Sequence, residues 1–456
     1  MVKISVAYKK MHFIGIGGIH MSGLAEMCKL FGCGVSGSDA KRSDITDRLT
    51  LLGIPVAIGH SAVNIDPSVD LIVYTSAVKE HNPEMARARE LNLRIMDKAG
   101  LLGHIMEKYK QSICVSGSHG KTSTTAMIAE TLYGLDFNPT IMNGGICTRL
   151  NASMFPGGTR YFVTEADEYY DAFLKMKPHI GVILNIDHDH ADYFPTFDSL
   201  WQSFYRFARL IDENGALVVH GGIPDIYTLT DGLKCSVITY GTEDSNWQAG
   251  GLQWGADGFP VFKAMHNGKN MGTVRLSVPG EHNADNALAA LAVCYELGAS
   301  IPDAAAQLIK SKGAARRFQL RKTLNGASII DDYAHHPAEI RATLYAAKKM
   351  LAGGGRLIAA FQPHTRSRTL ELYEEFVVSF NEADKILLLD IFTPSGREES
   401  HINIASADLC KSLLERGKDA VYRATFDEAA HYLRGLCEPG DIVIIMGAGD
   451  IIKLEV

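Results

Sequence analysis

The segment 112–125, SICVSGSHGKTSTT, places an apolar run, a glycine turn and a polar, helix-forming stretch in direct succession. Only two residues separate Gly117 from Gly120, and Lys121 and Thr122 follow at once. A Walker A loop has four residues between its glycines, so this loop is shorter than the common form. A buried strand that turns through glycines into a helix is the unit from which parallel α/β sheets are built, and an α/β fold is therefore predicted.

The same pattern begins near residue 11. The apolar run MHFIGI turns at Gly15, Gly17 and Gly18 and enters an amphipathic stretch from Met21 to Leu30. Further strands are expected in GVSGSD, which ends at residue 39, and in DLIVYTSAV, with helical stretches between them. This alternation predicts a βαβ domain with a parallel sheet over residues 1–108.

Two more units follow along the chain. After the polar boundary at 106–111, strands are expected in RYFVTEADE, HIGVILNID, ALVVHGG and CSVITYG, then β-hairpins in the Gly- and Trp-rich segment 246–262 and a helix over 280–298. From residue 327 the βα alternation restarts in ASIIDDYAHHP, RLIAAFQPH, KILLLDIF and DIVIIMGAGD. We therefore expect domains at 1–108, 109–322 and 323–456, which agrees with a length of 456 residues at roughly 100–200 residues per domain.

Composition narrows the class of protein. A net charge of −7 argues against a nucleic acid as the main partner. Eight cysteines without a C-x-x-C pair predict buried thiols in a reducing compartment. With neither a leader-like start nor an uncharged apolar run of membrane length, the sequence predicts a cytoplasmic enzyme.

The short glycine loop predicts phosphate binding. Backbone N–H groups at a helix N-terminus face an anion, Lys121 can reach the outer phosphates, and the Thr122 hydroxyl can ligate Mg²⁺. Such a site needs carboxylates or imidazoles at neighbouring strand ends. Two expected strands end in such groups, which are Glu165, Asp167 and Glu168 after one, and Asp187, His188, Asp189, His190 and Asp192 after the next. Solvated turn acids remain the alternative interpretation.

Other interpretations stay open at this point. His188-x-His190-x-Asp192 is similar to a dinuclear metallohydrolase signature, although Tyr193 stands where that signature has histidine. In GIGGIHMSG, His20 occupies the position that the dinucleotide fingerprint gives to glycine or alanine, so a diphosphate ligand is favoured over NAD, and a tight turn without ligand remains possible. A Rossmann oxidoreductase would need that glycine. A non-enzymatic nucleotide-binding switch would need the phosphate loop but not the later histidine motifs.

Nine motifs in order carry a resemblance to a known family. They are GIGGIHMSGLAE, GSHGKTSTT, EADEYYDAFL, NIDHDHADYF, GEHNADNALAA, RRFQ, DDYAHHPAEI, FQPHTRSRT and MGAGDI. Together they resemble the Mur ligases of peptidoglycan synthesis, whose nucleotide loop has the short form G-[ST]-x-G-K-[ST]. The resemblance implies an N-terminal Rossmann-like domain, a central P-loop ATPase-type domain with a mixed sheet, and a C-terminal Rossmann-like domain.

The resemblance also implies a reaction. ATP and Mg²⁺ would be the cofactors, and UDP-N-acetylmuramate and L-alanine the substrates, joined through an acyl phosphate by a cytoplasmic monomer or homodimer without nucleic-acid or membrane partners. EADEYYDAFL and GEHNADN resemble equally the family members that attach a tripeptide in murein recycling, which is the alternative. The paired arginines of FQPHTRSRT favour a single amino acid.

Site residues follow from the resemblance by position in this sequence. Lys121 would neutralise the transferring phosphoryl group, and Thr122, Glu165 and His190 would hold the metal. The expected catalytic residues are Lys121, Glu165, His190, His336, His364 and Arg368. The expected nucleotide contacts are Gly117, Ser118, His119, Gly120, Lys121, Thr122, Ser123, His282, Asn283, Asn286, Arg317 and Asp332. The expected substrate contacts are Gly15, Gly17, Gly18, Ile19, His20, Met21, Ser22, Ser38 and Asp39 on the UDP side, and Arg366 in the substrate and amino-acid pocket.

Two departures from the family pattern bear on these expectations. Many members that add L-alanine have arginine directly after the histidine of FQPH, whereas this chain has Thr365, with Arg366 one place later. His335, with the other groups of the third unit, is expected to line the amino-acid pocket. The segment 203–219 contains no lysine, so no carbamylated lysine is expected there.

Overall fold

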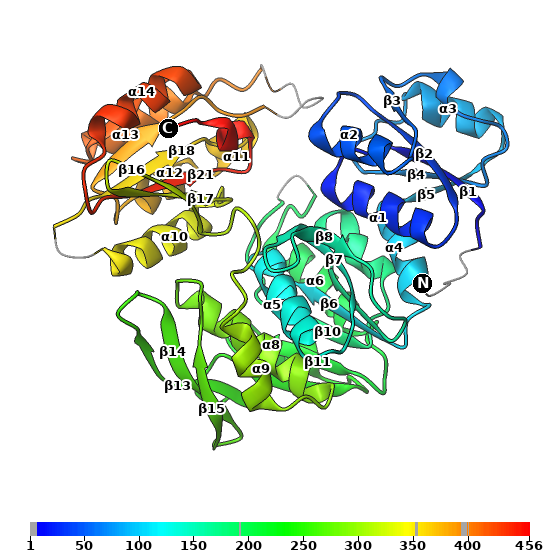
Figure 1. Ribbon diagram of the computed structural model, residues 1–456, viewed down its shortest axis with the longest axis horizontal. Coiled ribbons are helices and arrows are strands. Elements are labelled where there is room, and N and C mark those ends of the chain that lie inside the picture. The colour runs from blue at the N-terminus through cyan, green and yellow to red at the C-terminus, as the bar shows by residue number, and fades with distance from the viewer. Residues whose placement is uncertain (1–6, 191–192, 352–353, 394–398, 400) are drawn as a thin grey trace. The chain divides into compact units, whose positions relative to one another are not determined.

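The computed structural model describes residues 7–190, 193–351, 354–393, 399 and 401–456, and these form three β-sheets with helices packed on them (Figure 1). The α/β class expected from the strand–loop–helix pattern is confirmed. The contacts within the chain divide it into two compact units. The first comprises Met1–Gly250, Lys263–Val274 and Asp285–Ala314, and the second Gly251–Phe262, Arg275–Ala284 and Ala315–Val456.

The first sheet has five parallel strands in the order β3-β2-β1-β4-β5. Its strands are β1 (Lys10–Ile14), β2 (Gly34–Asp39), β3 (Val56–Ile58), β4 (Leu71–Tyr74) and β5 (Arg94–Asp97). Its helices are α1 (Ile19–Leu30), α2 (Asp44–Leu51), η1 (Ala62–Asn64), α3 (Pro83–Glu90) and α4 (Lys98–Met106). Residues of α1 and α4 share one core with Met11 and Phe13, while α3 packs on Ile14 and Ile72 from the other face.

Side-chain caps specify where several of these helices begin. Ser43 accepts the N–H of Thr46 at the start of α2, and Asp97 accepts the N–H of Gly100 at the start of α4. Asn82 caps α3, whose first residue is Pro83. Proline suits that position because its missing N–H would lack a partner in the helix, and a capping side chain contributes about 1 kcal/mol.

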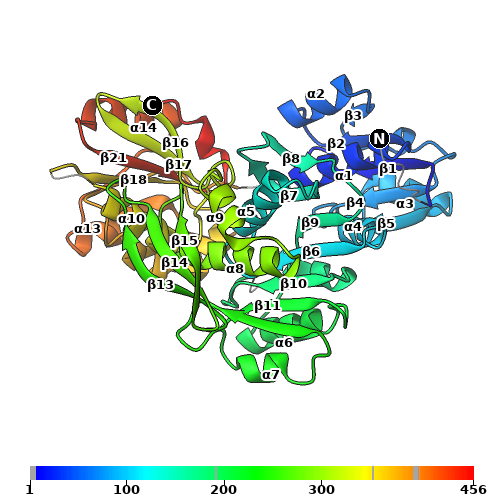
Figure 2. The same ribbon diagram turned by 60° about the horizontal axis from the view of Figure 1, so that its bottom comes forward.

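The second sheet has ten strands in the order β15-β14-β13-β12-β11-β10-β6-β9-β7-β8. Strands β12 to β7 in that order run parallel, and β8 is antiparallel to β7. The strands are β6 (Gln111–Ser116), β7 (Thr140–Cys147), β8 (Ala152–Phe155), β9 (Tyr161–Glu165), β10 (Ile180–Ile183), β11 (Ala216–His220), β12 (Ser236–Tyr240), β13 (Trp247–Trp254), β14 (Pro260–His266) and β15 (Lys269–Arg275). Figure 2 shows β6, β10 and β11 side by side.

Helices cover this sheet and bury its central strands. They are α5 (Lys121–Gly134), η2 (Tyr169–Lys175), α6 (Phe197–Ala208), α7 (Ile226–Thr230), α8 (His282–Glu296) and α9 (Ile301–Leu308). Every residue of β9 and β10 is buried, which agrees with their nearly continuous apolar sequence. Strands covered on both faces have this character in α/β proteins.

The third sheet has six strands in the order β16-β17-β21-β18-β19-β20, all parallel except β16. Its strands are β16 (Gln319–Leu324), β17 (Ala327–Asp332), β18 (Leu357–Phe361), β19 (Lys385–Leu388), β20 (Ala420–Tyr422) and β21 (Ile442–Met446). Its helices are α10 (Pro337–Met350), α11 (Arg366–Glu371), α12 (Tyr373–Ser379), α13 (Ser406–Glu415), α14 (Phe426–Leu436) and η3 (Asp450–Lys453). Separate apolar cores lie on its two faces.

All eight cysteines are buried, as their apolar surroundings in the sequence predict. Among the described residues, no helix is both long enough and apolar enough to cross a membrane.

Candidate functional site

The phosphate loop joins β6 to α5 in the first unit. Gly117 and Gly120 have φ angles of 141° and 84°, which favour glycine, and Gly120 is the N-cap of α5. Ser118 and His119 are bound to residues that follow the neighbouring strand β10. The Ser118 hydroxyl donates to the carbonyl of Asp187 (2.8 Å), and the N–H of His119 donates to the Asn185 side chain (2.8 Å). The loop is thus fixed by contacts with the chain that follows β10.

Lys121 is the first residue of α5, and its ammonium group donates hydrogen bonds to the loop and to a neighbouring carboxylate. It donates to both oxygens of Glu168 (2.9 and 2.8 Å) and to the carbonyl oxygens of Gly117 (2.6 Å) and Ser118 (3.4 Å). Burial works against the charge of Lys121, but Glu168 and Asp167 outweigh it and raise the pKa of the ammonium group. Lys121 is therefore a cation at neutral pH.

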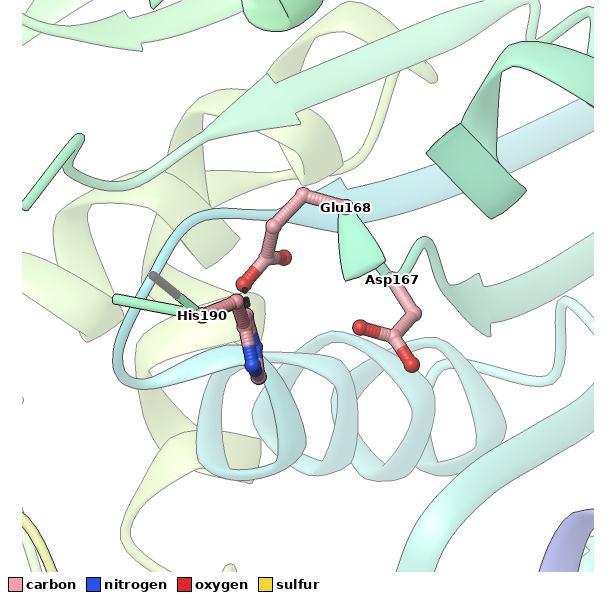
Figure 3. Close-up of side chains that lie close together, drawn as sticks. All are labelled: Asp167, Glu168 and His190. Carbon is pink, nitrogen blue, oxygen red and sulfur yellow. Dashed lines mark ion pairs between the residues drawn. The ribbon is translucent and has the colours of Figure 1, made fainter. Parts of the chain in front are cut away.

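Two carboxylates and an imidazole gather beside this lysine (Figure 3). Asp167 and Glu168 follow β9, and His190 follows β10; one possible ligand atom from each lies within 4.8 Å of the others. Figure 3 shows Glu168 directed at the His190 ring, where the Oε1 to Nε2 distance is 3.5 Å. Glu168 is only 1% exposed, and this donor set suits a divalent cation.

The electrostatics of this cluster depend on its mixture of signs. Burial opposes ionisation of Asp167, but Lys121, Lys98 and His190 hold the pKa of its carboxyl group below the ordinary value. Burial lowers the pKa of His190. The carboxylates of Glu168, Asp189 and Asp167 raise it by more, so the pKa of His190 lies above its ordinary value. His190 also has a φ of 58°, an uncommon backbone conformation for a residue other than glycine and one that tends to occur at functional sites.

Glu165, the expected metal ligand from β9, lies at the edge of this cluster. It is 9% exposed, and its carboxylate accepts the N–H of Gly144 on β7 at 2.5 Å. His20 of α1 is sensitive to the same charges. Burial lowers its pKa, and Lys98 acts in the same sense, while Glu165 and Asp167 act against them.

The first sheet carries a second glycine loop, between β1 and α1. The N–H groups of Gly15 (2.8 Å) and Ile16 (3.0 Å) both donate to the carbonyl of Ser38, and Gly17 donates to the Asp39 carboxylate (2.8 Å). The expected substrate residues Ser38 and Asp39 are therefore joined to the loop itself. The Ser38 side chain is fully buried and donates to Glu84, so it faces the interior.

Two expected adenine contacts lie near the start of α8. Asn286 borders the phosphate loop, since a Cβ added at Gly120 would lie 3.2 Å from its side-chain oxygen. Asn283 is buried and donates to the carbonyl of Pro279 (2.6 Å). His282 folds over Gly280, where an added Cβ would meet its ring at 2.5 Å.

In the second unit, the carboxyl edge of the third sheet collects most of the remaining expected residues. Asp332 accepts the N–H groups of Phe318 (2.7 Å) and Ala334 (2.8 Å), and burial raises the pKa of its carboxyl group. Glu339 on α10 accepts the backbone N–H of His335 (3.1 Å) and lies 3.6 Å from Arg317. His336, the N-cap of α10, also donates its backbone N–H to Glu339.

The loop after β18 contains the departure from the family pattern. The His364 ring stacks on Phe392 at 5.5 Å and lies 5.9 Å from the His335 ring. Thr365 has a φ of 64° and accepts the N–H of Arg368 at the start of α11. Arg366 donates to the carbonyls of Ile402 and Ile404.

The structure thus brings Lys121 and His190 together, and it places His335, His336 and His364 at one sheet edge. Asp192, used in the metallohydrolase interpretation, lies outside the described residues. The sequence named Asp167 and Glu168 among the strand-end acids, but only Glu165 of these was expected to hold the metal, and Glu339 was not expected at the site. The acids of the EADE motif were visible at a strand end, but spacing could not tell which carboxylate would pair with Lys121.

Three family models match the chain. They are described as the Mur ligase family catalytic domain (residues 10–110), the Mur ligase middle domain (residues 115–294) and the Mur ligase glutamate ligase domain (residues 316–449). Matches to curated proteins span nearly the whole length.

The UDP-N-acetylmuramate–L-alanine ligase of Acetivibrio thermocellus is 42% identical over 449 residues, covering 98% of this chain and 95% of that protein. The ligase of the same name from Caldanaerobacter subterraneus is 43% identical over 448 residues, covering 98% and 96%. Among solved structures, the UDP-N-acetylmuramate–alanine ligase of Thermotoga maritima matches with a TM-score of 0.83 at 29% identity, over 98% of this chain and 97% of that one. The murein peptide ligase of Psychrobacter arcticus matches with a TM-score of 0.73 at 25% identity, over 98% and 97%.

Proposed function

The chain belongs to the Mur ligase family, and we propose that it joins L-alanine to UDP-N-acetylmuramate at the expense of ATP, in the synthesis of peptidoglycan precursors. The observation that carries the proposal is the full-length similarity to ligases of that name, at 42–43% identity. The Lys121–Glu168–His190 cluster beside the glycine loop supplies chemistry of the required kind.

The first step assigned to this chain is phosphoryl transfer from ATP to the substrate carboxylate. The loop N–H groups and Lys121 bind the phosphates, and Lys121 neutralises charge that develops on the transferred group. Lys121 must leave Glu168 to do so, because both oxygens of that carboxylate now occupy it. Positioning and charge neutralisation, rather than covalent chemistry by the protein, account for catalysis of this type.

The cluster also fits the cation that such a reaction needs. Asp167, Glu168 and His190 offer two carboxylates and an imidazole within reach of one ion. Thr122 and Glu165 are the further ligands proposed from the family pattern. Bound Mg²⁺ would supply additional positive charge at the phosphates.

The amino-acid end of the reaction is assigned to the third sheet. His335, His336 and His364 lie on the loops after β17 and β18, and Arg368 lies in the first turn of α11. We propose that Arg368 binds the alanine carboxylate, as the family pattern of FQPHTRSRT suggests. Asn283, Asn286, Arg317 and Asp332 are proposed to contact the nucleotide.

The test is a substrate panel with trapping of the intermediate. ATP, Mg²⁺ and UDP-N-acetylmuramate alone should form an enzyme-bound acyl phosphate, which borohydride reduces to an alcohol, and steady ADP release should require L-alanine. Exclusion of water from the site would protect the acyl phosphate until the amine arrives. An ADP release rate that is the same with and without both substrates would reject the proposal. Ligation of a tripeptide but not of alanine would favour the recycling activity.

A further inference from the structure

A buried carboxylate lies directly behind the glycine loop of the first sheet. Glu84, in the first turn of α3, has an exposed fraction of 0%. It accepts hydrogen bonds from the Ser38 hydroxyl (2.5 Å), the Asn64 side-chain amide (2.6 Å) and the backbone N–H of Ser61 (3.3 Å). His12 Nε2 and His60 Nδ1 lie 3.7 Å and 3.5 Å from its Oε2. The partners come from β1, β2, η1 and the loop after β3.

This carboxylate is an anion at all physiological pH values. Burial works against ionisation, but the neighbouring His12 ring and the hydrogen bonds from Ser38 and Asn64 outweigh it and hold the pKa of Glu84 at about 2. A buried anion is costly unless donors surround it. Glu84 therefore fixes the orientation of each group that donates to it.

The hydrogen bonds continue from Glu84 to the loop through Ser38. Its hydroxyl donates to Glu84, and its carbonyl accepts the N–H groups of Gly15 and Ile16. Because that hydroxyl hydrogen points to Glu84, the contact of 3.1 Å between Ser38 Oγ and His60 Nδ1 requires Nδ1 to carry the hydrogen and to donate. The same residue thus orients the loop backbone and sets the tautomer of His60.

The β1–α1 loop lies at the place in the first sheet where a ligand is expected to bind. β1 has β2 on one side and β4 on the other, so the connections leave the carboxyl edge in opposite directions next to the loop. Ligands of open α/β sheets bind at such a switch point. Gly15 lies close to the loop that follows β4, since a Cβ added at Gly15 would lie 2.8 Å from the Thr75 side chain.

We propose that Glu84 is a positioning residue for the nucleotide-sugar substrate. It acts through Ser38, whose carbonyl holds the N–H groups of Gly15 and Ile16, and it thereby fixes the shape of the glycine loop that leads into α1 at the diphosphate site. This inference rests on the function proposed above, because that function supplies the ligand. Its signature is a loss of affinity for the UDP-sugar without a matching change in the use of ATP.

The experiment measures binding of UDP-N-acetylmuramate to the full chain by calorimetry, without ATP. Glu84→Gln keeps the shape but removes the charge, and we expect Kd to rise about tenfold, as for loss of one charged hydrogen bond. The KM for ATP should stay within about twofold of wild type, because ATP binds at a different loop. Glu90→Gln removes a charge from the exposed face of the same helix and should bind like wild type.

Two further measurements separate positioning from general destabilisation. Ser38→Ala keeps Glu84 and its other donors, and it should raise Kd for the UDP-sugar as well. The double variant should lose no more affinity than the weaker-binding single variant, because both changes break one path. An unchanged Kd in a folded Glu84→Gln or Ser38→Ala variant would overturn the inference. Absence of binding by the wild-type chain would instead count against the proposed function.

Discussion

The glycine loops of the first and second sheets follow the same plan but differ in charge. In each, a parallel strand turns through glycines into a helix, and a buried glutamate lies behind the turn: Glu84 behind the β1–α1 loop and Glu168 beside the β6–α5 loop. The shortest contacts of Glu84 are with a hydroxyl and an amide, whereas those of Glu168 are with the ammonium group of Lys121.

This difference separates a fixed binding loop from a reactive one. Hydroxyl and amide donors inside the first sheet have no reason to leave Glu84 when a ligand binds, so the loop keeps its shape. Lys121 can exchange Glu168 for a phosphate, because both partners are anions. The second loop can therefore deliver a positive charge to a reacting group, whereas the first keeps a fixed backbone shape.

The largest effect is expected from removing that deliverable charge. Lys121→Ala should lower ligation by roughly three orders of magnitude or more, as for other charge-stabilising groups in phosphoryl transfer, while UDP-sugar binding stays within about twofold. ADP release and calorimetry measure the two quantities. Lys110→Ala, at an exposed position before β6, is the matched control. Near-normal turnover in Lys121→Ala would remove the distinction between the loops.

Removing the partner of Lys121 should have the next largest effect. Glu168→Gln leaves Lys121 and His190 without their shared anion, and we expect kcat to fall about 100-fold, with a higher Mg²⁺ concentration needed for half-maximal rate. Initial rates over a Mg²⁺ series test this, with the exposed Glu213→Gln as control. A faster rate than wild type would mean that Glu168 only restrains Lys121.

The pH dependence of stability should distinguish the first loop. The pKa of Glu84 falls from an ordinary value of 4.5 to about 2 on folding, so its stabilising contribution is complete above about pH 4.5 and is lost as pH falls through 2. His12 and His60 are the titratable groups that face it. Hydrogen exchange of β1 and β2 amides should show wild type more protected than Glu84→Gln by about 2 kcal/mol at pH 7, with the difference shrinking toward pH 2. A difference that is constant with pH would refute the linkage.

The smallest expected effect comes from crowding the first loop. In Gly17→Ala the new Cβ would lie 2.8 Å from the Asp39 carboxylate, which must move and so loosen its contact with the loop. We expect KM for the UDP-sugar to rise roughly fivefold and kcat to change little. Gly34→Ala in β2 serves as control, because its new Cβ would lie 3.5 Å from the nearest atom, which is ordinary contact. Equal KM values for both variants would show that the Asp39 contact is dispensable.

Much of this architecture could be predicted because strong local patterns specify it. The glycine turns at 15–18 and 117–120, and the apolar runs of β6, β9, β10 and β21, mark strand–loop–helix units without ambiguity. β3 and β5 escaped prediction because three or four residues at a sheet edge show too little apolar periodicity. β16 was missed because its polar sequence, QLRKTL, belongs to an exposed antiparallel edge.

The candidate site was predicted less completely, for a geometric reason. Lys121 and His190 stand out by residue type at strand and helix ends. Which acid of Glu165, Asp167 and Glu168 meets Lys121 depends on how the chain turns after β9, and Glu165 instead accepts a backbone N–H from β7. Glu84 escaped prediction entirely, because a glutamate after a proline at a helix start is ordinary on an exposed surface.

The burial of all eight cysteines has a practical consequence for following this protein in motion. Burial raises the pKa of every one of these thiols, and thiol reagents attack the thiolate form. A cysteine introduced at Glu90 on α3 and another at Lys411 on α13, both exposed, would therefore take up fluorescent dyes against a silent native background. Energy transfer between such a donor and acceptor would report, molecule by molecule, whether the distance between the two labelled positions changes when each substrate is added.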